Sequence, residues 1–256
     1  MLSVSHSNII ALASMVAISA SPALLSAQAP RTISGVALDT QGRPLANAQV
    51  RVRADFVYGR AEATTGTDGK YAVRDLLRAT YRVEAWVQRD YAGAPICSQL
   101  AMPAPTDYNS FDISRGAVRN FHWQLTGRIG FSDASFGAEL MVWYDRPTGG
   151  TARGLEFTLT PTGPLIDGTR GTVLVREVAF ASSPSSNDLK DVPLGTYRLS
   201  VALLGKDGSR TPLTIATRDN PEFQRTVDVA WTPFRFCGMG PPSGVDPFLV
   251  RLEPAG

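Results

Sequence analysis

The sequence predicts an all-β protein made of two antiparallel β-sandwich units, of immunoglobulin-like or transthyretin-like type, that follow a signal peptide. Three observations carry this prediction. Short runs alternate apolar and polar residues with the period of a strand, 23 glycines and 18 prolines can supply many turns, and no helical periodicity follows the N-terminal segment. A hydrophobic fraction of 43% with 19% charged residues indicates a folded chain rather than a disordered one.

The N-terminal segment, residues 1–29, has the pattern of an export signal. It contains no Asp, Glu, Lys or Arg, and an apolar run from Ile9 to Ala20 precedes the small residues Ala27 and Ala29. We expect cleavage after Ala29, with cleavage after Ala27 as the alternative. A membrane anchor is the alternative, but the run is shorter than the roughly 20 residues that span a bilayer, which favours a cleaved signal. Since no later run is long and apolar enough to span a bilayer, we expect a mature chain without a transmembrane span, in the periplasm or outside the cell.

The first unit, residues 30–126, shows strand alternation most clearly at Ala48–Ala54. Val50 and Val52 share one face of this run, and Arg51 and Arg53 share the other, which predicts one buried and one solvated side. Two more runs repeat the pattern: Tyr81–Val87 and Arg119–Leu125. Turn residues separate the runs at Asp39–Pro44 and at Asp68-Gly69, and the second of these is typical of a hairpin.

Five segments of this unit resemble the carboxypeptidase regulatory-like domain. They are Ile33–Asp39 (ISGVALD), Gly42–Leu45 (GRPL), Ala48–Val52 (AQVRV), Thr67–Tyr71 (TDGKY) and Thr80–Val83 (TYRV). The resemblance spans residues 31–87, with 118–125 as a last strand, and departs from the family at Arg78-Ala79, where a Gly is usual. It implies a sandwich similar to transthyretin-like and carbohydrate-binding-like folds, and it implies no activity.

The second unit, residues 127–256, contains an echo of the first. Leu189–Val201 aligns without gaps with Val73–Ala85, and an Asp, a Thr, a Tyr and an Arg coincide. The other predicted strands are Ala138–Tyr144, Leu155–Thr160, Val173–Phe180, Phe223–Trp231 and Phe248–Leu252. Between the units, Gln88–Arg115 is too long for a hairpin, so we expect either a functional loop or a tethered crossover.

The two cysteines, Cys97 and Cys237, are candidates for a disulfide because an exported chain reaches an oxidising compartment. Two unconnected thiols are the alternative, since the sequence does not place the two Cα atoms. The bond would close a loop of about 140 residues and contribute on the order of 4 to 5 kcal/mol in the chain-entropy model.

Composition removes several function classes. A net charge of +2 with scattered basic residues does not indicate the basic patch that binds nucleic acid. Two Cys and two His do not suffice for a Cys-rich or multi-His metal centre. We therefore expect no cofactor, no metal site and no catalytic residue. His122 alternates with Asn120 and Gln124, which indicates a surface imidazole rather than a general base.

The remaining hypothesis is a non-enzymatic recognition module for which carbohydrate is the first ligand class to test. Aromatic side chains off the core are the ligand-binding candidates: Phe56, Tyr58, Trp86, Tyr91, Tyr108 and Trp143. The alternative for each is packing against the other unit or a loop. A scaffolding protein of the cell envelope that engages protein partners is the alternative function, and a hydrolase is the least favoured one.

Overall fold

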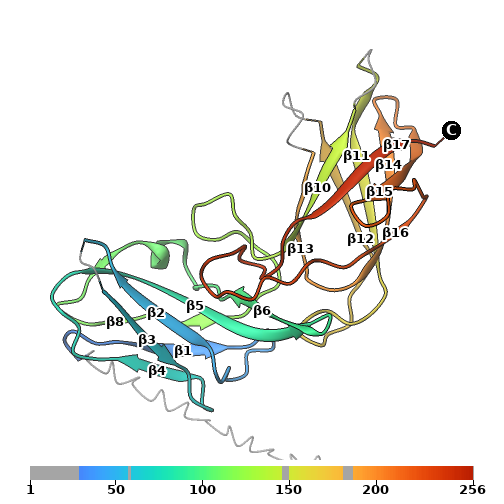
Figure 1. Cartoon of the computed structure of the whole chain (residues 1–256). Coiled ribbons are helices and arrows are strands. Elements are labelled where there is room, and N and C mark those ends of the chain that lie inside the picture. Colours follow the sequence, from blue (N-terminus) through green and yellow to red (C-terminus); the bar gives the residue numbers. More distant parts are fainter. Residues whose placement is uncertain (1–28, 57–58, 146–149, 181–186, 256) are drawn as a thin grey trace, which may run out of the picture.

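The structure, a computed structural model, describes residues 29–56, 59–145, 150–180 and 187–255. Within these ranges the chain forms strands and loops with one short 3-10 helix, Pro105–Tyr108, so the all-β prediction is confirmed. No helix in these ranges has the length and apolar character needed to cross a membrane. The predicted signal peptide, apart from Ala29, lies outside the described residues. Figure 1 shows a first β unit beside a second one.

The first unit packs two sheets around one buried cluster. One sheet has the order β4-β1-β8, with β9 also paired to β1, and the other has the order β3-β2-β5-β6, with β7 paired to β5. The inward faces of the alternating runs supply the cluster, which includes Val50, Val52, Tyr81 and Phe121. The strands are β1 Ile33–Leu38, β2 Gln49–Ala54, β3 Arg60–Thr64, β4 Lys70–Val73, β5 Thr80–Tyr91, β6 Ala94–Gln99, β7 Phe111–Asp112, β8 Ala117–Val118 and β9 Phe121–His122.

The predicted strand Arg119–Leu125 is wrong as one continuous strand, because only its residues Phe121–His122, β9, form a ladder, and the short strand β8 ends just before Arg119. Both pair with β1 in parallel, whereas most other pairs are antiparallel. At the break, the Asn120 Oδ1 atom accepts the Val36 amide at 3.1 Å. Gly35 lets β1 approach this break closely, since a Cβ there would collide with the Arg119 carbonyl oxygen.

The Asp68-Gly69 turn does not close a two-strand hairpin. Gly69 takes a positive φ of 72°, as the sequence indicates, but β3 on one side of the turn pairs with β2, and β4 on the other side pairs with β1. The turn therefore joins the two sheets of the sandwich. A local dipeptide signal identified the turn correctly but not the partners of the strands beside it.

The second unit has the strand order β12-β11-β14-β15-β17-β10-β13, with β16 paired to β14. Its strands are β10 Ala138–Tyr144, β11 Ala152–Pro161, β12 Leu174–Ala179, β13 Leu189–Val192, β14 Tyr197–Gly205, β15 Arg210–Thr217, β16 Val227–Val229 and β17 Phe248–Pro254. The first residues of β15 pair with β14, and the rest, Leu213–Thr217, pair with β17. In this way β15 passes from one layer of the sandwich to the other. The pair β10–β17 is parallel.

Most strands predicted for this unit are present, and their bounds differ by a few residues. Ala138–Tyr144 is found as predicted, whereas only Val227–Val229 of the predicted Phe223–Trp231 strand forms a ladder. The sequence analysis missed β15. Tyr81, Trp123 and Tyr197 are buried, as is typical of large aromatics on inward strand positions.

A hairpin from the first unit enters the core of the second. Residues of the β5–β6 hairpin, Tyr91 and Ile96, belong to the second buried cluster (Figure 1). The Tyr91 hydroxyl donates to the Gly195 carbonyl at 3.1 Å and accepts the Trp231 amide at 3.3 Å. The prediction of a long loop over Gln88–Arg115 is therefore wrong for its first part, which is strand. The division at residues 126 and 127 stays a prediction, because the second buried cluster contains residues from before it and the partly buried Ile166 from after it packs against the first cluster.

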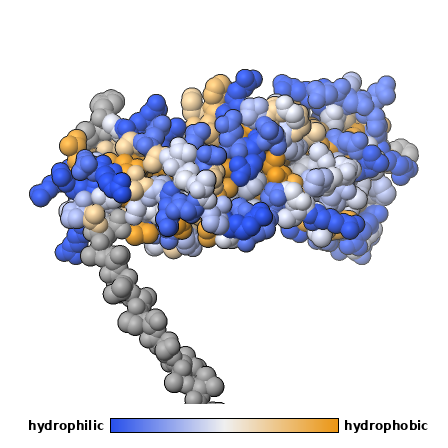
Figure 2. Space-filling model, turned by 90° about the horizontal axis from the view of Figure 1, so that it is seen from below, coloured by the Kyte–Doolittle hydropathy of each residue, from blue (hydrophilic) through white to orange (hydrophobic). Residues whose placement is uncertain are grey.

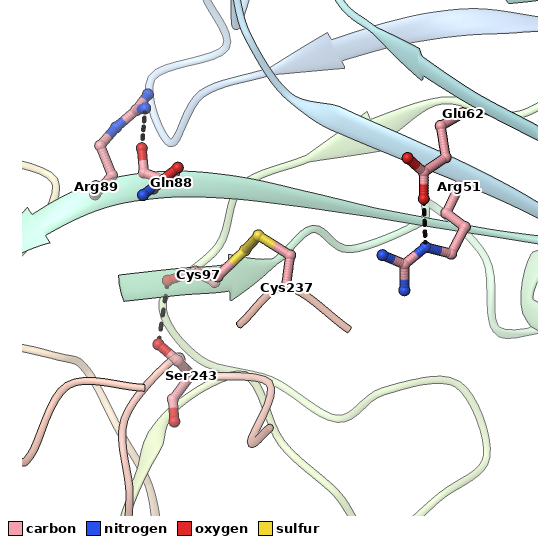
Figure 3. Close-up of a disulfide and its surroundings, with 8 residues drawn as sticks. Arg51, Glu62, Gln88, Arg89, Cys97, Cys237 and Ser243 are labelled. Atoms are coloured by element: carbon pink, nitrogen blue, oxygen red, sulfur yellow. Dashed lines mark hydrogen bonds and ion pairs between the residues drawn. A yellow bond between two sulfur atoms is a disulfide. The ribbon is translucent and has the colours of Figure 1, made fainter. Parts of the chain in front are cut away.

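The segment 232–246 of the second unit lies along β6 of the first. The amides of Cys97 and Gln99 donate to the carbonyls of Phe234 and Pro242 at 3.3 and 2.8 Å. The predicted disulfide between Cys97 and Cys237 is confirmed, with a Cα–Cα distance of 5.1 Å (Figure 3). The bond and the hydrogen bonds together fasten the C-terminal segment over the edge of the first unit's sheet.

Candidate functional site

Trp143 is the exposed tryptophan of the described chain. It lies on β10, where Leu140, Val142 and Tyr144 alternate inward to the core, so Met141 and Trp143 project from the outer face. Its side chain is 64% exposed, while Trp86, Trp123 and Trp231 are at most 5% exposed. A large aromatic ring held on a rigid strand and left in water is a platform that a ligand can cover.

Charged side chains surround this ring on the same face. In the parallel pair β10–β17, Arg251 lies directly beside Trp143, and Glu253 follows two residues later on the same side of β17. The Arg251 guanidinium carbon lies 5.3 Å from the centroid of the Phe223 ring. No described carboxylate lies within ion-pair distance of Arg251, so its donors are available to an incoming group.

A hollow of about 190 Å³ is formed between these side chains. Its lining includes Trp143, Asp145, Phe223, Arg251 and Glu253. The hollow combines two aromatic rings with one cation and two carboxylates, and so offers apolar faces together with hydrogen-bond donors and acceptors. A sugar ring presents C–H groups on its faces and hydroxyls at its rim, which this combination matches. We call these five residues the Trp143 face.

Two of the sequence-predicted ligand residues are buried. Trp86 is 5% exposed, because two residues lie against its ring. Gly238 of the C-terminal segment is so close that a Cβ added to it would lie 2.9 Å from the ring, and the Arg51 guanidinium carbon lies 4.9 Å from the ring centroid. Figure 3 shows Arg51 with its ion-pair partner Glu62 near the disulfide. Tyr91 is 6% exposed inside the second cluster. The interpretation of both rings as lying off the core is wrong, because segments distant in sequence cover them.

Of the remaining candidates, those within the described residues do not line the hollow beside Trp143. Phe56 is 92% exposed in the loop after β2 of the first unit, and Tyr58 lies outside the described residues. Tyr108 is half-buried in the 3-10 helix, and its hydroxyl accepts the Met102 amide at 2.9 Å. Burial raises the pKa of this phenol. The five candidates that the structure describes therefore do not line one hollow together.

The sequence-based expectations for catalysis and metal binding concern His122 and the side chains that commonly ligate metals. His122 is half-buried, and its Nε2 atom lies 2.8 Å from the Gln124 Oε1 atom, which is a hydrogen bond between neighbours on one strand face. In the part of the chain that the structure describes, no group of three His, Cys, Asp or Glu side chains is placed to hold a metal ion.

The first unit has a recognisable family. The family model described as "Carboxypeptidase regulatory-like domain" matches residues 32–93. This segment, which is less than half of the chain, therefore resembles that domain. The matched segment contains β1 to β5 and the turns that the sequence motifs identified. The Trp143 face lies outside it, on the second unit.

Comparison with solved structures returns distant matches. A DUF3823 family protein from Bacteroides uniformis is 10% identical, with 79% of this chain and 99% of that chain covered and a TM-score of 0.25. A DUF3823 family protein from Bacteroides ovatus is 13% identical, with coverage of 79% and 99% and the same TM-score, 0.25. GBS52, the minor pilin of Streptococcus agalactiae, is 11% identical, with coverage of 88% and 98% and a TM-score of 0.26. At these scores the three structures support no conclusion about this chain.

No curated protein matches the sequence. The residues that the sequence analysis missed are the neighbours of Trp143, namely Asp145, Phe223, Arg251 and Glu253. Alternation along the predicted strand Phe248–Leu252 places Arg251 opposite the buried Val250 and Leu252, and this pattern could have identified Arg251 as outward-facing. No local pattern brings Phe223 to the same place.

Proposed function

We propose that this protein is an exported, non-enzymatic recognition protein that binds a carbohydrate on the Trp143 face. The observation that carries the proposal is a mostly exposed tryptophan beside an arginine without an ion-pair partner among the described residues, at the rim of a hollow of about 190 Å³. The site binds by stacking a pyranose ring on Trp143 while Arg251 donates to ring hydroxyls and Glu253 accepts from them.

Export is supported by the signal-like N-terminal segment and by the disulfide. A structural disulfide persists in an oxidising compartment, which agrees with a periplasmic or extracellular location. Figure 2 shows hydrophobic residues in small patches among hydrophilic ones on the face it displays.

The test is binding of the mature chain to a glycan array and a panel of polysaccharides. Trp143→Ala removes the platform, and its matched control is Phe131→Ala, which removes another exposed aromatic ring (71% exposed) that does not line the hollow. We expect retention of at least one glycan by the wild type, a loss of roughly tenfold or more in affinity for Trp143→Ala, and no change for Phe131→Ala.

Arg251→Ala is a second variant that tests the polar half of the site. Loss of a charge-assisted hydrogen bond to a hydroxyl is expected to reduce affinity by about tenfold. Binding that is equally strong in the wild type, Trp143→Ala and Arg251→Ala would place the glycan elsewhere, and absence of binding to every glycan would refute the proposal.

A scaffolding role in the cell envelope is the second candidate. The observation that favours it is an uncovered sheet edge in the second unit, at β12. The two functions use different elements, since Trp143 lies on β10 and the edge lies at the far end of the strand order.

A further inference from the structure

The edge strands β6 of the first unit and β12 of the second differ in whether another segment of the chain covers them. The edge strand β6 of the first unit is covered, because the amides of Cys97 and Gln99 donate to carbonyls of segment 232–246 and the disulfide holds that segment in place. Edge strand β12 of the second unit pairs with β11 on one side, and no described strand pairs with its other side. With six residues it is longer than the other uncovered edge strands β3, β4 and β13. A strand of this length offers a template for an added strand.

The backbone direction at this edge follows from one hydrogen bond. The Phe180 amide donates to the Arg153 carbonyl at 3.0 Å, which continues the β12–β11 register by one residue. Backbone groups alternate in an antiparallel ladder, so even-numbered residues of β12 bond to β11. The amides and carbonyls of Val175 and Glu177 therefore point outward, away from the sheet.

The core face of β12 has an apolar, basic, apolar pattern. Leu174 and Val178 pack against the second buried cluster, and Arg176 lies between them on the same face with its guanidinium exposed. The Arg176 Nη1 atom donates to the carbonyl of its own neighbour Val175 at 3.4 Å, and no described carboxylate lies within ion-pair distance of it. A charged side chain at this position disfavours pairing of β12 with most other strands, but it permits pairing with a strand that carries the opposite charge.

Arg176 also occupies the position where a cross-strand partner comes closest. When an antiparallel strand bonds to the outward groups of Val175 and Glu177, Arg176 falls at a non-hydrogen-bonded pair, in which Cα atoms are about 4.5 Å apart. An acidic side chain opposite it stabilises the pair, and a basic one destabilises it. Apolar side chains opposite Leu174 and Val178 extend the buried cluster.

We propose that β12 binds an extended segment of a protein partner as an added antiparallel strand, with a carboxylate opposite Arg176 and apolar residues two positions before and after that carboxylate. A second copy of this chain does not supply this pattern. In a two-fold symmetric pair the residue opposite Arg176 comes from the core face of the other β12, which carries Leu174, Arg176 and Val178 and no carboxylate. The inference is independent of carbohydrate binding, because it uses neither Trp143 nor Arg251.

The experiment uses two short fluorescent peptides in anisotropy titrations against the mature chain. Both alternate Thr with core-face residues, which are Val, Glu, Val in the acidic probe and Val, Lys, Val in the basic probe. We expect the wild type to prefer the acidic probe by about tenfold, and Arg176→Glu to reverse the preference. Equal binding of both probes, or no binding of the acidic probe to the wild type, would overturn the proposal.

A pair of substitutions at Val175 separates backbone pairing from side-chain contact. Val175→Pro removes an outward amide without removing a β12–β11 hydrogen bond, and Val175→Thr keeps the amide while changing the side chain. We expect Val175→Pro to lose the acidic probe and Val175→Thr to retain it, with both variants still folded by circular dichroism. If folded Val175→Pro binds the acidic probe as the wild type does, the proposal of strand addition at this edge is wrong. If Val175→Pro does not fold, the probe preference of Arg176→Glu tests the proposal instead.

Discussion

The joint between β4 and β5 and the joint between β13 and β14 use the same local device in the two units. The Tyr81 hydroxyl donates to the Leu77 carbonyl at 3.0 Å, and the Tyr197 hydroxyl donates to the Pro193 carbonyl at 2.7 Å. Four residues separate donor and acceptor in both cases. Asp75 and Asp191, which coincide in the sequence echo, both adopt a positive φ, 56° and 62°. The echo thus reports a shared backbone turn closed by a tyrosine.

The surroundings of the two joints differ. The Asp191 carboxylate accepts the amides of Gly127 and Gly137 at 2.8 to 3.1 Å, so it fastens the entry of the second unit. No described hydrogen bond of this kind ties Asp75 to a distant segment. Tyr197 also meets Trp231 edge-on at 6.0 Å. The comparison teaches that a repeated sequence specifies a local turn, while its stability contribution depends on neighbours that the repeat does not contain.

The largest expected effect on stability comes from removing the disulfide, which joins the two units. Replacing both Cys97 and Cys237 with Ser opens a loop with a sequence separation of 140. The chain-entropy model gives a loss of about 4 to 5 kcal/mol in the free energy of unfolding. Urea unfolding of the double variant and of the reduced wild type should give the same lowered midpoint. A midpoint unchanged from the oxidised wild type would show that the bond adds no stability.

Asp191→Gly and Asp75→Gly separate turn strain from side-chain contacts. Glycine relieves the positive φ at both positions, but Asp191→Gly also removes acceptors of two amides. We expect Asp191→Gly to lose about 2 kcal/mol of unfolding free energy and Asp75→Gly to change it by less than about 1 kcal/mol. Denaturant midpoints measure both, and equal losses would contradict the distinction between the joints.

Tyr81→Phe and Tyr197→Phe test whether the two tyrosine hydroxyls are equivalent. Each variant removes one hydrogen bond to a carbonyl four residues earlier and keeps the ring. We expect losses of about 1 kcal/mol in both, because the bonds match in geometry. Chemical denaturation measures the unfolding free energy of the two single variants. A loss in only one of them would show that the two hydroxyl hydrogen bonds do not contribute equally to stability.

The stability of the folded chain is also expected to depend on alkaline pH, and this effect is confined to pH values above about 10. Burial raises the pKa of Tyr197 to about 12, while an unfolded tyrosine titrates at about 10. As the pH rises, the unfolded state loses this proton first, so the contribution of the neutral folded phenol is full below about pH 10 and is lost between about 10 and 12. The urea midpoint should fall less steeply across this window in Tyr197→Phe than in the wild type. Parallel curves would contradict the shifted pKa.

Residues whose environment is set by their own strand could be predicted from the sequence. The alternation over Ala138–Tyr144 gave the bounds of β10 and the outward position of Trp143, which is confirmed as exposed. The turn at Asp39–Pro44 has Gly42 at a φ of 77°, as its composition indicates. Periodicity suffices in these places because one face meets the core and the other meets water.

Residues covered by a distant segment could not be predicted in the same way. Trp86 alternates with outward residues of β5, yet segment 232–246 covers it, and Pro95 made β6 look like a loop although it pairs with Asp90 in the hairpin. Arg251 lies beside Trp143 only because β17 pairs with β10, and Phe223 reaches the same hollow from the segment after β15. Contacts of this kind depend on topology, which a local pattern does not contain.

Carbohydrate binding at Trp143 is tested most directly by the fluorescence of that residue. The other three tryptophans are buried, so iodide quenching of the native protein reports mainly on Trp143. During titration with each polysaccharide of the panel, we expect at least one to cause a saturable blue shift and to protect the emission from iodide, and we expect Trp143→Phe to lose both changes. A polysaccharide that binds while Trp143 stays fully quenchable, or a panel that produces no change at all, would contradict the proposed site.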